Sequence, residues 1–442
     1  MNKKKKLLVY AHYYYPDVAS TGQILTELCE GLKETFDITV ICVVPSYTGK
    51  IEEKYKTKRI YKENINGINI VRVKVPEFQK SNKISRIKNL LAYFFNSLIA
   101  TLKIEKQDYI FTISQPPILG GVLGVLGKWI KGGKLIYNIQ DFNPEQTMAV
   151  GYAKNKLLLT IVMMIDKFSC KQSNEVIVVG RDMQETLRNR FNNKKIPKNT
   201  FINNWINEKE ICPLSENHPK IVEFKEKYNL QDKFIIMYSG NIGLYYDLEN
   251  IINVIGKFNG REDVIFAFVG EGTVKQEIES YVIENKLSNV TFIPYQDKSD
   301  LVYSLNAADI HWVVNAKGIK GVSVPSKLYG VMAAGKPVLG VLDEGSEARL
   351  IVDQCNCGVC TEPGNYNEIY NKIEYILNNK EKVKKLGENG RRYLEMNLTK
   401  DVSINKYKNT ILSLDSNIIH KKNEDNKKSH SRNSKLKDEG EN

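Results

Sequence analysis

Residues 321–340 read GVSVPSKLYGVMAAGKPVLG and place a short helix between two glycine-bearing turns. The piece LYGVMAA has the length of about two helical turns, and Gly335 followed closely by Pro337 is a helix stop signal. The small residues and the proline of VSVPS leave free backbone N–H groups just ahead of the helix. Lys327 falls in the first turn, where a cation opposes the helix dipole. An anionic ligand in front of the helix would explain this lysine, and a solvated surface lysine is the alternative.

The sequence on both sides of this stretch alternates between apolar strands and helical segments. Strands are predicted over 6–14, 37–44, 68–75, 109–114, 134–140 and 175–180 in the first half, and over 234–240, 264–272, 289–295, 309–315 and 337–342 in the second. Near-continuous Val and Ile runs of this kind, separated by helices, are typical of parallel sheets covered on both faces. The expected fold is therefore α/β, with two Rossmann-like, doubly wound domains. Ligands bind at the carboxyl ends of parallel strands, so we expect the domains to face each other across a cleft.

The chain divides into four predicted parts. An N-terminal Rossmann-like domain is expected over 1–205 and a C-terminal one over 206–398, with the boundary in the segment WINEKEICPLSENHPK. A C-terminal helix over 399–416 could return to the N-terminal domain. Residues 417–442 lose apolar periodicity and are charged and polar, so they are expected to form a disordered tail.

The excess of positive over negative charge lies entirely in the first half of the chain. The 442 residues contain 64 Lys and Arg against 51 Asp and Glu, a net charge of +13, whereas residues 1–205 alone hold 32 basic and 17 acidic residues. Such asymmetry indicates an acidic partner for that half, either an anionic membrane surface or a nucleic acid. Residues 80–106 alternate basic residues with Leu, Phe and Ile at helical spacing, as in a helix that lies in a membrane interface. An ordinary amphipathic helix packed on the sheet is the alternative.

Several cellular locations and chemistries are disfavoured by the sequence. No window reaches 18 apolar residues, the basic start lacks the apolar core of a signal peptide, and the seven cysteines are an odd, mostly scattered set. These features indicate a reducing cytoplasm without a membrane span. A dinucleotide fingerprint, a P-loop and a D-x-D pair are all missing. The sites that remain suit a diphosphate held by backbone amides and lysine, so no metal is expected.

Six segments in this order carry a resemblance to a known family. They are YYYPDVASTGQILTELCEGL (13–32), NIQDFNPEQ (138–146), YSGNIGLYYDLENII (238–252), FVGEG (268–272), VTFIPYQ (290–296) and PSKLYGVMAAGKPV (325–338). Together they resemble the retaining glycosyltransferases of family 4, which have the GT-B arrangement of two Rossmann-like domains. The resemblance covers roughly residues 5–415. It is strongest to the branch that adds deoxy or N-acetylated sugars, such as fucose or N-acetyl-fucosamine, to bacterial capsule, O-antigen and colanic-acid precursors.

The resemblance implies a reaction and its partners. A sugar, expected to be a deoxy or N-acetylated hexose, would move with retention of configuration from a nucleotide-sugar, expected to be UDP-linked. The acceptor would be a saccharide on a polyprenyl diphosphate lipid, in capsule, O-antigen or exopolysaccharide synthesis. The nucleotide-sugar is a substrate, so no cofactor is expected, and no metal or nucleic acid takes part. The enzyme would be cytoplasmic and attached peripherally to the anionic inner face of the cell membrane.

The resemblance also implies roles for particular residues. Asp141 would orient or deprotonate the acceptor hydroxyl, and Lys327 would stabilise the departing diphosphate. The expected donor-phosphate contacts are Gly22, Gly240, Asn241, Gly243, Ser323, Val324 and Lys327. The expected nucleoside contacts are Gly270, Glu271, Pro294, Tyr295, Ser326, Tyr329 and Glu347. The acceptor side is expected to comprise His12, Tyr14, Asp17 and Glu145.

The sequence departs from the family pattern at three positions. Two glutamates, eight residues apart, are usual in the family, and here Val322 and Gly330 occupy their places. The usual Arg–Lys phosphate clamp after the first strand of the second domain is missing, since Asn241 stands there without a nearby Arg or Lys. Lys327 is therefore expected to supply the charge for the phosphates, and Glu347, Ser326 or Tyr329 the contact with the ribose.

Two other functions remain open from the sequence. A UDP-N-acetyl-sugar epimerase can share this fold, but it would need acid and base groups in the cleft, for which His12 and Asp17 are the obvious sources. A nucleic-acid-binding protein is suggested only by the basic first half. Known modules of that kind interleave aromatic residues with Lys and Arg, and this sequence contains no such module.

Overall fold

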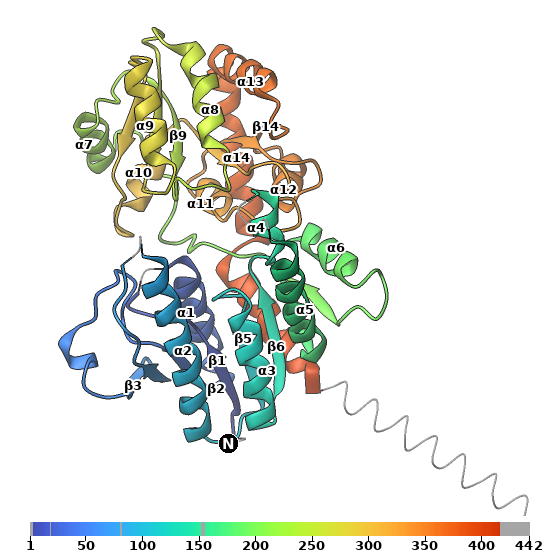
Figure 1. Ribbon diagram of the computed structural model, residues 1–442. Helices are drawn as coiled ribbons and strands as arrows, with labels where there is room; N and C mark the ends of the chain where they lie inside the picture. The colour runs from blue at the N-terminus through green and yellow to red at the C-terminus, as the bar shows by residue number, and fades with distance from the viewer. Residues whose placement is uncertain (1–2, 18, 80–81, 152–154, 416–442) are drawn as a thin grey trace, which may run out of the picture.

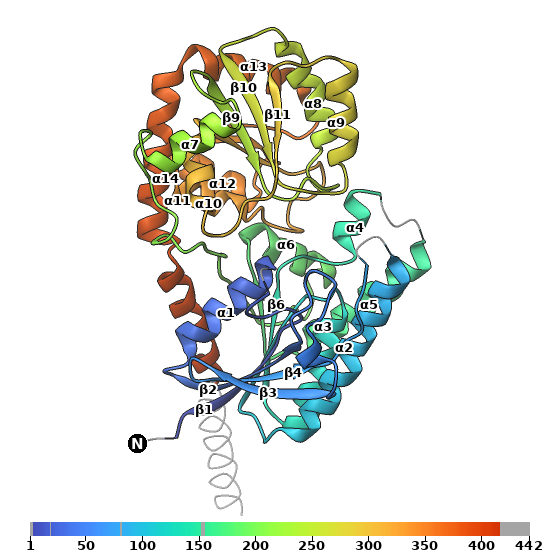
Figure 2. The ribbon, with the colours of Figure 1, turned by 90° about the vertical axis from the view of Figure 1, so that its left-hand side faces the viewer.

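The computed structural model describes residues 3–17, 19–79, 82–151 and 155–415. The predicted tail over 417–442, like residue 416, lies outside the described residues. Two α/β domains lie one above the other, joined by a linker between residues 202 and 218 (Figure 1). Each domain has its own sheet with helices on both faces (Figure 2). The architecture is the predicted pair of doubly wound domains.

The N-terminal domain contains an eight-stranded sheet in the order β3-β4-β2-β1-β5-β6-β7-β8. Its elements are β1 (Lys5–Tyr10), α1 (Ser20–Leu32), β2 (Phe36–Val43), the 3₁₀ helix η1 (Glu53–Tyr55), β3 (Ile60–Ile65), β4 (Ile68–Val73), α2 (Lys83–Lys103), β5 (Tyr109–Ile113), α3 (Leu119–Lys131), β6 (Lys134–Ile139), α4 (Glu145–Ala149), α5 (Lys156–Gln172), β7 (Glu175–Val178), α6 (Arg181–Arg190) and β8 (Asn199–Phe201). All pairings are parallel except that of β3 with β4. The two edge strands, β3 and β8, were not predicted from the sequence.

The apolar runs of the strands are buried on both sides of this sheet. Leu7 and Val9 of β1 belong to the core on one face, and Leu8 and Tyr10 belong to the core on the other. Successive side chains of a strand point to opposite faces, so a strand covered by helices on both sides must be apolar throughout. The same reason accounts for the Val and Ile runs of the second half.

The C-terminal domain contains a six-stranded, fully parallel sheet in the order β11-β10-β9-β12-β13-β14. Its elements are α7 (Pro219–Lys227), β9 (Phe234–Ser239), α8 (Leu248–Ile255), the 3₁₀ helix η2 (Gly256–Phe258), β10 (Val264–Val269), α9 (Lys275–Glu284), β11 (Val290–Ile293), α10 (Leu301–Ala307), β12 (Ile310–Val314), α11 (Lys327–Ala333), β13 (Val338–Val341), α12 (Glu347–Cys355), β14 (Gly358–Thr361), α13 (Tyr366–Asn378) and α14 (Lys380–Asn397). The short helix of the 321–340 stretch is α11, and it begins at Lys327.

The chain crosses back to the N-terminal domain after α14. A helix over residues 400–415 packs Ile404, Tyr407 and Ile411 into the core of the first sheet. The Tyr407 hydroxyl accepts a hydrogen bond from Asn138 Nδ2 (3.1 Å), and the Tyr109 hydroxyl donates to Asp415 (2.5 Å). The first strand and the last described helix therefore belong to the same domain. In the part of the chain that the structure describes, no helix has the length and apolar character needed to cross a membrane.

Direct contacts also fix the two domains against each other. The Phe142 N–H donates to the Val322 carbonyl (2.8 Å), and Asp141 and Ser323 form an isolated antiparallel bridge. The Asp182 carboxylate accepts the Gly321 N–H (2.8 Å), also across the domain boundary. The loop after β6 is thereby held against the loop before α11.

Substitution of Tyr407 tests the contribution of the returning helix to stability. Tyr407→Ala should lower the free energy of unfolding by about 3 kcal/mol or more, because a fully buried aromatic side chain is removed from the core. Tyr407→Phe should cost about 1 kcal/mol, since only the hydrogen bond from Asn138 is lost. Urea denaturation followed by fluorescence measures both, and equal effects of the two variants would contradict this account of the packing.

Candidate active site in the interdomain cleft

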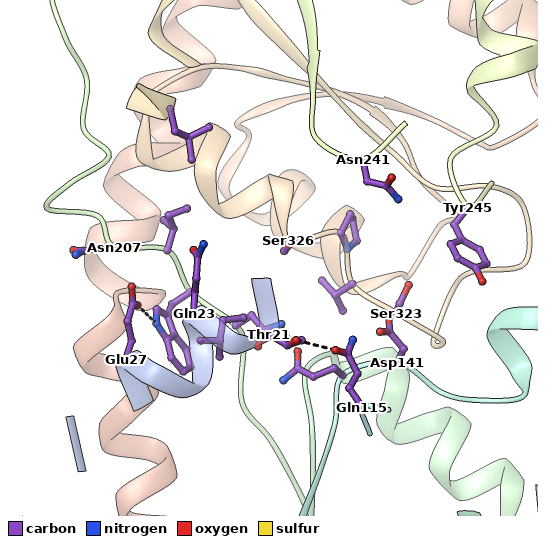
Figure 3. A pocket seen from close by; sticks show the side chains of 18 of the residues that line it. Thr21, Gln23, Glu27, Gln115, Asp141, Asn207, Asn241, Tyr245, Ser323 and Ser326 are labelled. Atoms are coloured by element: carbon purple, nitrogen blue, oxygen red, sulfur yellow. Dashed lines mark hydrogen bonds between the residues drawn. The ribbon is translucent and has the colours of Figure 1, made fainter. Parts of the chain in front are cut away.

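A cavity of about 390 Å³ lies between the two domains. We call it the cleft cavity. Thr21, Gln115 and Asp141 line it from the N-terminal domain, and Asn241 and Ser323 from the C-terminal domain (Figure 3). These residues lie at or just beyond the carboxyl ends of strands, except Thr21, which is in the first turn of α1. This is where a doubly wound domain binds ligands.

Two smaller cavities adjoin this region. The α2 cavity, of about 250 Å³, is lined by His12, Arg86, Asn89, Gln115 and Asp141, among others. The β9 cavity, of about 260 Å³, is lined by residues that include Gly240, Gly270, Tyr295, Ser326 and Lys327. Asp141 lines both the cleft cavity and the α2 cavity, and Ser326 lines both the cleft cavity and the β9 cavity. The cleft cavity therefore adjoins each of the other two.

Asp141 is the carboxylate at the centre of this arrangement. It follows β6, its N–H donates to Ser114 Oγ (3.3 Å), and Gln146 Nε2 donates to its Oδ1 (3.3 Å). Burial raises the pKa of the Asp141 carboxyl to about 6, against the smaller opposing effect of a hydrogen bond with Gln115. A carboxyl group with a pKa just below neutrality can accept a proton from a substrate and release it again.

Lys327 is a cation without a counter-ion. Its Nζ lies 3.8 Å from the ring centroid of Tyr246 and 5.0 Å from that of Tyr238. Among the described residues, no carboxylate forms an ion pair with it, and burial lowers the pKa of its amine to about 7. The faces of aromatic rings attract a cation, but they do not neutralise its charge. An anion that enters the cavity would raise this pKa and hold the lysine in its charged form.

Glycines make room for Lys327 and for the loops around it. A Cβ at Gly240, where φ is +140°, would lie 2.5 Å from Lys327 Cε. A Cβ at Gly270, where φ is +133°, would lie 2.1 Å from the Gly240 carbonyl oxygen, and one at Gly272 would lie 1.9 Å from that of Ile242. The loops after β9 and β10 therefore pack backbone against backbone, which only glycine allows.

The structure brings most of the predicted donor residues to these cavities. Asn241, Ser323 and Val324 line the cleft cavity, Gly240, Gly270, Tyr295 and Lys327 line the β9 cavity, and Ser326 lines both. The other donor residues lie beside or behind these walls. Gly22 lies in α1 between two lining residues, Gly243 is buried behind Asn241, Pro294 precedes Tyr295, and the Glu271 side chain forms an ion pair with Lys275 (2.8 Å).

Two predicted nucleoside contacts are wrong. Glu347 is fully buried, and its carboxylate accepts hydrogen bonds from the Arg181 backbone N–H (2.8 Å) and from Arg181 Nε (2.9 Å). Asn203 Nδ2 also donates to Glu347 (3.0 Å) and approaches the buried Tyr329 hydroxyl (3.5 Å). Neither Glu347 nor Tyr329 lines one of the three cavities. Both instead join the C-terminal domain to residues of the first domain and the linker.

Three of the four predicted acceptor-side residues have other partners. Tyr14 is buried in the core of the first sheet, and the Asp17 carboxylate accepts the backbone N–H groups of Ser46 (3.2 Å) and Tyr47 (3.1 Å). Glu145 forms two hydrogen bonds of 2.5 Å with the Arg190 guanidinium. These predictions are corrected, because structural contacts already occupy the side chains.

The fourth acceptor-side residue, His12, does line the α2 cavity. Burial lowers the pKa of His12 to about 4, so the ring is neutral at physiological pH. Its buried Nε2 has no hydrogen-bond partner within the described residues. An epimerase would need an acid and a base in the cleft, for which His12 and Asp17 were the candidates. Asp17 lines none of the three cavities, so the structure does not bring these two groups together there.

Sequence reasoning missed the tyrosine rings beside Lys327 and the hydrogen bond by which Gln115 joins two loops of the site. Tyr246 lies beneath the lysine, and Asp141 raises the pKa of its hydroxyl further, after the larger effect of burial. Gln115 Oε1 accepts a hydrogen bond from Thr21 Oγ1 (2.8 Å), which joins α1 to the loop after β5. The adjacent tyrosines that follow SGNIG were the available signal for the first feature. Among the described residues, no group of three or more His, Cys, Asp or Glu could hold a metal ion.

Two such domains with a cavity between their strand ends form the GT-B fold. Sucrose-phosphate synthase from Thermosynechococcus elongatus shares it with a TM-score of 0.75 and 16% identity, over 93% of this chain and 100% of its own. HepE of Anabaena, solved in complex with UDP-glucose, shares it with a TM-score of 0.66 and 12% identity, over 92% and 99% of the two chains.

Sequence comparison relates the C-terminal domain to one family and the whole chain to glycosyltransferases. Residues 220–393 match the family described as glycosyl transferases group 1. The probable glycosyltransferase WbjE of Pseudomonas aeruginosa is 25% identical, over 75% of this chain and 82% of its own length. The putative colanic acid biosynthesis glycosyl transferase WcaI of Escherichia coli is also 25% identical, over 92% and 99% of the two chains. Residues 220–393 therefore match a group 1 glycosyl transferase domain, in a chain that has the GT-B fold and is similar to glycosyltransferases over most of its length.

The depressed pKa of Lys327 predicts a pH-dependent cost of folding. An exposed lysine has a pKa near 10.5, so between about pH 7 and 10.5 the unfolded chain binds more protons, and stability rises with pH. Lys327→Met cannot be protonated at this position. The variant should therefore be more stable than wild type by a margin that is largest at pH 6 and shrinks by pH 9.

Urea denaturation at both pH values measures this margin. Lys317→Met, a substitution of an exposed lysine in the same domain, is the control and should show the same difference at both. A margin for Lys327→Met that does not change with pH would show that the lysine is not buried as a cation.

Proposed function

We propose that the protein transfers a sugar from a UDP-linked donor to a lipid-linked saccharide, with retention of configuration and without a metal ion. The sugar is a deoxy or N-acetylated hexose, and the pathway is synthesis of a capsule, O-antigen or related exopolysaccharide. The names of the relatives WbjE and WcaI support the class of pathway, and the HepE complex supports a UDP donor. The reaction takes place in the cytoplasm at the inner face of the membrane, where lipid-linked intermediates present their saccharides.

The unpaired charge of Lys327 carries the proposal. When the bond between the anomeric carbon and the diphosphate oxygen breaks, the leaving group takes the electron pair and gains negative charge. A cation already in place, in a site of low dielectric, stabilises that charge without reorganisation. No carboxylate among the described residues competes for Lys327, so its field is free to act on the diphosphate.

The cavities suggest how the donor lies. The diphosphate would lie between the loop at Gly240 and Asn241 and the loop at Ser323 and Val324. From there the nucleoside would extend into the β9 cavity toward Tyr295, a residue that is 60% exposed. The sugar would then lie in the cleft cavity, with its anomeric carbon facing the N-terminal domain.

Asp141 would act on the acceptor. The acceptor oxygen forms the new bond to the anomeric carbon on the face that the diphosphate leaves, and its proton passes to Asp141 or to the departing phosphate oxygen. With a pKa of about 6, Asp141 is mostly ionised at neutral pH and can receive that proton. The α2 cavity, which shares Asp141 and Gln115 with the cleft cavity, is the place for the acceptor saccharide.

Nucleotide binding tests the donor site. In the presence of EDTA, UDP or one UDP-sugar should raise the melting temperature of the wild type, and Lys327→Met should bind it about 10- to 100-fold more weakly, since a charge-assisted contact is lost. Lys336→Met is the matched control, because this partly buried lysine of the same domain lines none of the three cavities. No shift with any nucleotide, from a folded wild type, would refute the donor site.

The pH dependence of the rate tests both residues together. The value of kcat/KM should rise through about pH 6 as Asp141 ionises and fall above about pH 7 as free Lys327 loses its proton. Asp141→Asn should lower kcat by about 10²- to 10⁴-fold and leave UDP binding unchanged. Lys327→Arg, if active, should lose the alkaline limb. A flat profile for kcat/KM between pH 5 and 8 would contradict both assignments.

A further inference from the structure

Three neighbouring helices of the N-terminal domain, α2, α3 and α5, turn apolar side chains outward. They lie side by side on one face of the sheet in both views (Figures 1 and 2). We call this surface the helix platform. On α2 the exposed large apolar residues recur at helical spacing: Ile84, Ile87, Leu91, Phe95 and Leu102. The residues that α2 buries fully are Asn89, Tyr93, Ser97, Ala100 and Thr101, which are mostly small or polar, and Ala92, Phe94 and Leu98 pack partly buried against the core of the domain.

Helix α5 shows the same reversal, whereas α3 buries Leu123 and Val125 and contributes chiefly the exposed side chain of Trp129. The exposed apolar residues of α5 are Leu157, Leu158, Ile161, Met164, Ile165 and Phe168, whereas the helix buries only Asp166, Ser169 and Cys170. On α3, Trp129 is 59% exposed, and its ring meets Phe168 of α5 edge-on with centroids 6.1 Å apart. Helices of a globular domain normally turn their apolar stripe to the core, so this arrangement calls for an apolar partner.

Hydrogen bonds hold the platform as one unit. Lys131 of α3 donates to the carbonyl oxygens of Leu102 (3.3 Å) and Ile104 (2.6 Å) at the end of α2. Lys128, also of α3, donates to the carbonyl oxygen of Gln172 at the end of α5 (2.6 Å). The apolar side chains of the three helices are therefore presented together on a rigid surface.

The charges of the platform are nearly all positive. The three helices contain nine Lys and Arg residues and one acid, Asp166. Asp166 is buried and pairs with Arg190, so it does not face the solvent. An apolar surface bordered by cations complements an anionic lipid bilayer, in which acyl chains lie beneath negatively charged headgroups.

We propose that the helix platform inserts its apolar side chains into the headgroup–acyl boundary of an anionic bilayer. The platform also borders the active site, because Arg86, Asn89 and Leu90 near the start of α2 line the α2 cavity together with Asp141. A lipid-linked acceptor could thus pass from the bilayer to Asp141 without leaving the membrane surface. This last step rests on the proposed function, whereas the membrane contact rests on the platform alone.

Trp129 is a built-in reporter of insertion. The other two tryptophans, Trp205 and Trp312, are 5% and 2% exposed and lie outside the platform. Vesicles of phosphatidylglycerol with brominated acyl chains should quench the fluorescence of the wild type, and Trp129→Phe should abolish the quenching. Vesicles of phosphatidylcholine should quench much less. No quenching by the anionic vesicles, or equal quenching in Trp129→Phe, would overturn the proposal.

A second experiment uses variants of exposed residues, which should fold normally. The triple variant F95S/I161S/M164S should bind phosphatidylglycerol vesicles at least tenfold more weakly in sedimentation assays. The control I283S/M396S removes two apolar side chains of the C-terminal domain that are more exposed than those of the triple variant, and it should bind like wild type. Equal loss in both variants would overturn the platform as the site of contact.

Two further measurements separate this inference from its rivals. The UDP-induced thermal shift should be the same in the triple variant and the wild type, so a failed donor site and a failed membrane site give different results. Sedimentation equilibrium without lipid should show a monomer. A dimer that the triple variant abolishes would assign the platform to a second copy of the chain and overturn the bilayer proposal.

Discussion

The backbone contact between the two domains at Phe142 and Val322 determines the geometry of the site. The Phe142 N–H donates to the Val322 carbonyl, and the adjacent residues, Asp141 and Ser323, pair as a bridge. Asp182 reinforces the contact by accepting the Gly321 N–H. Gly321 has a φ of +69°, and a Cβ there would lie 2.4 Å from Thr186 Oγ1, so a side chain at this position would force the loops apart. The carboxylate that would serve the acceptor and the loop that would hold the donor phosphates are thus placed by the same few atoms.

The second constraint is the burial of an unpaired cation. A lysine in a low-dielectric cavity destabilises the protein without ligand, and this cost is recovered only when an anion binds. The absence of a side chain at Gly240 leaves space for the methylene groups of Lys327. The rings of Tyr246 and Tyr238 lie beside its amine and keep it at the cavity wall. A carboxylate partner would have made the apo protein more stable but would have competed with a diphosphate for the charge. The arrangement therefore favours ligand binding over stability.

Local sequence predicted the sheets and the loops that follow their strands, but not the long-range pairs. Lys327 was identified from its place in the first turn of a helix, and Asp141 and Asn241 from the resemblance to the family. Neither signal needs knowledge of tertiary partners. Glu347 and Glu145 were misassigned because their partners, Arg181 and Arg190, lie 166 and 45 residues away. Nothing in the flanking residues distinguishes a carboxylate that is free to bind a ligand from one that a distant arginine already holds.

The two positions at which this sequence lacks the glutamates of the family have different surroundings in the structure. Val322 occupies a position where the resemblance leads one to expect a glutamate, and it packs in a buried cluster at the domain boundary. Gly330, the other substituted position, lines the β9 cavity, where the nearest atom to a Cβ would be 3.6 Å away. A side chain at residue 330 could therefore be accommodated, so the glycine enlarges the proposed nucleoside site.

Periodicity alone could not decide which side of α2 faces the domain. The sequence shows an apolar stripe, and the usual rule would turn that stripe inward. In the structure, α2 and α3 approach strand β1 closely, and this close packing determines which side of α2 faces the domain. The Tyr10 hydroxyl hydrogen-bonds with Thr101 Oγ1 (2.7 Å), and a Cβ at Gly127 of α3 would lie 2.5 Å from the same hydroxyl. Most of the α2 residues that are fully buried at this interface are small or polar, Phe94 and Leu98 are partly buried there, and the exposed large apolar residues of α2 lie outside it. The distribution of charge agrees with this surface, since residues 1–205 carry the net positive charge and the remainder is nearly neutral. An anionic bilayer would contact only the first domain, whereas the nucleotide would bind chiefly to the second.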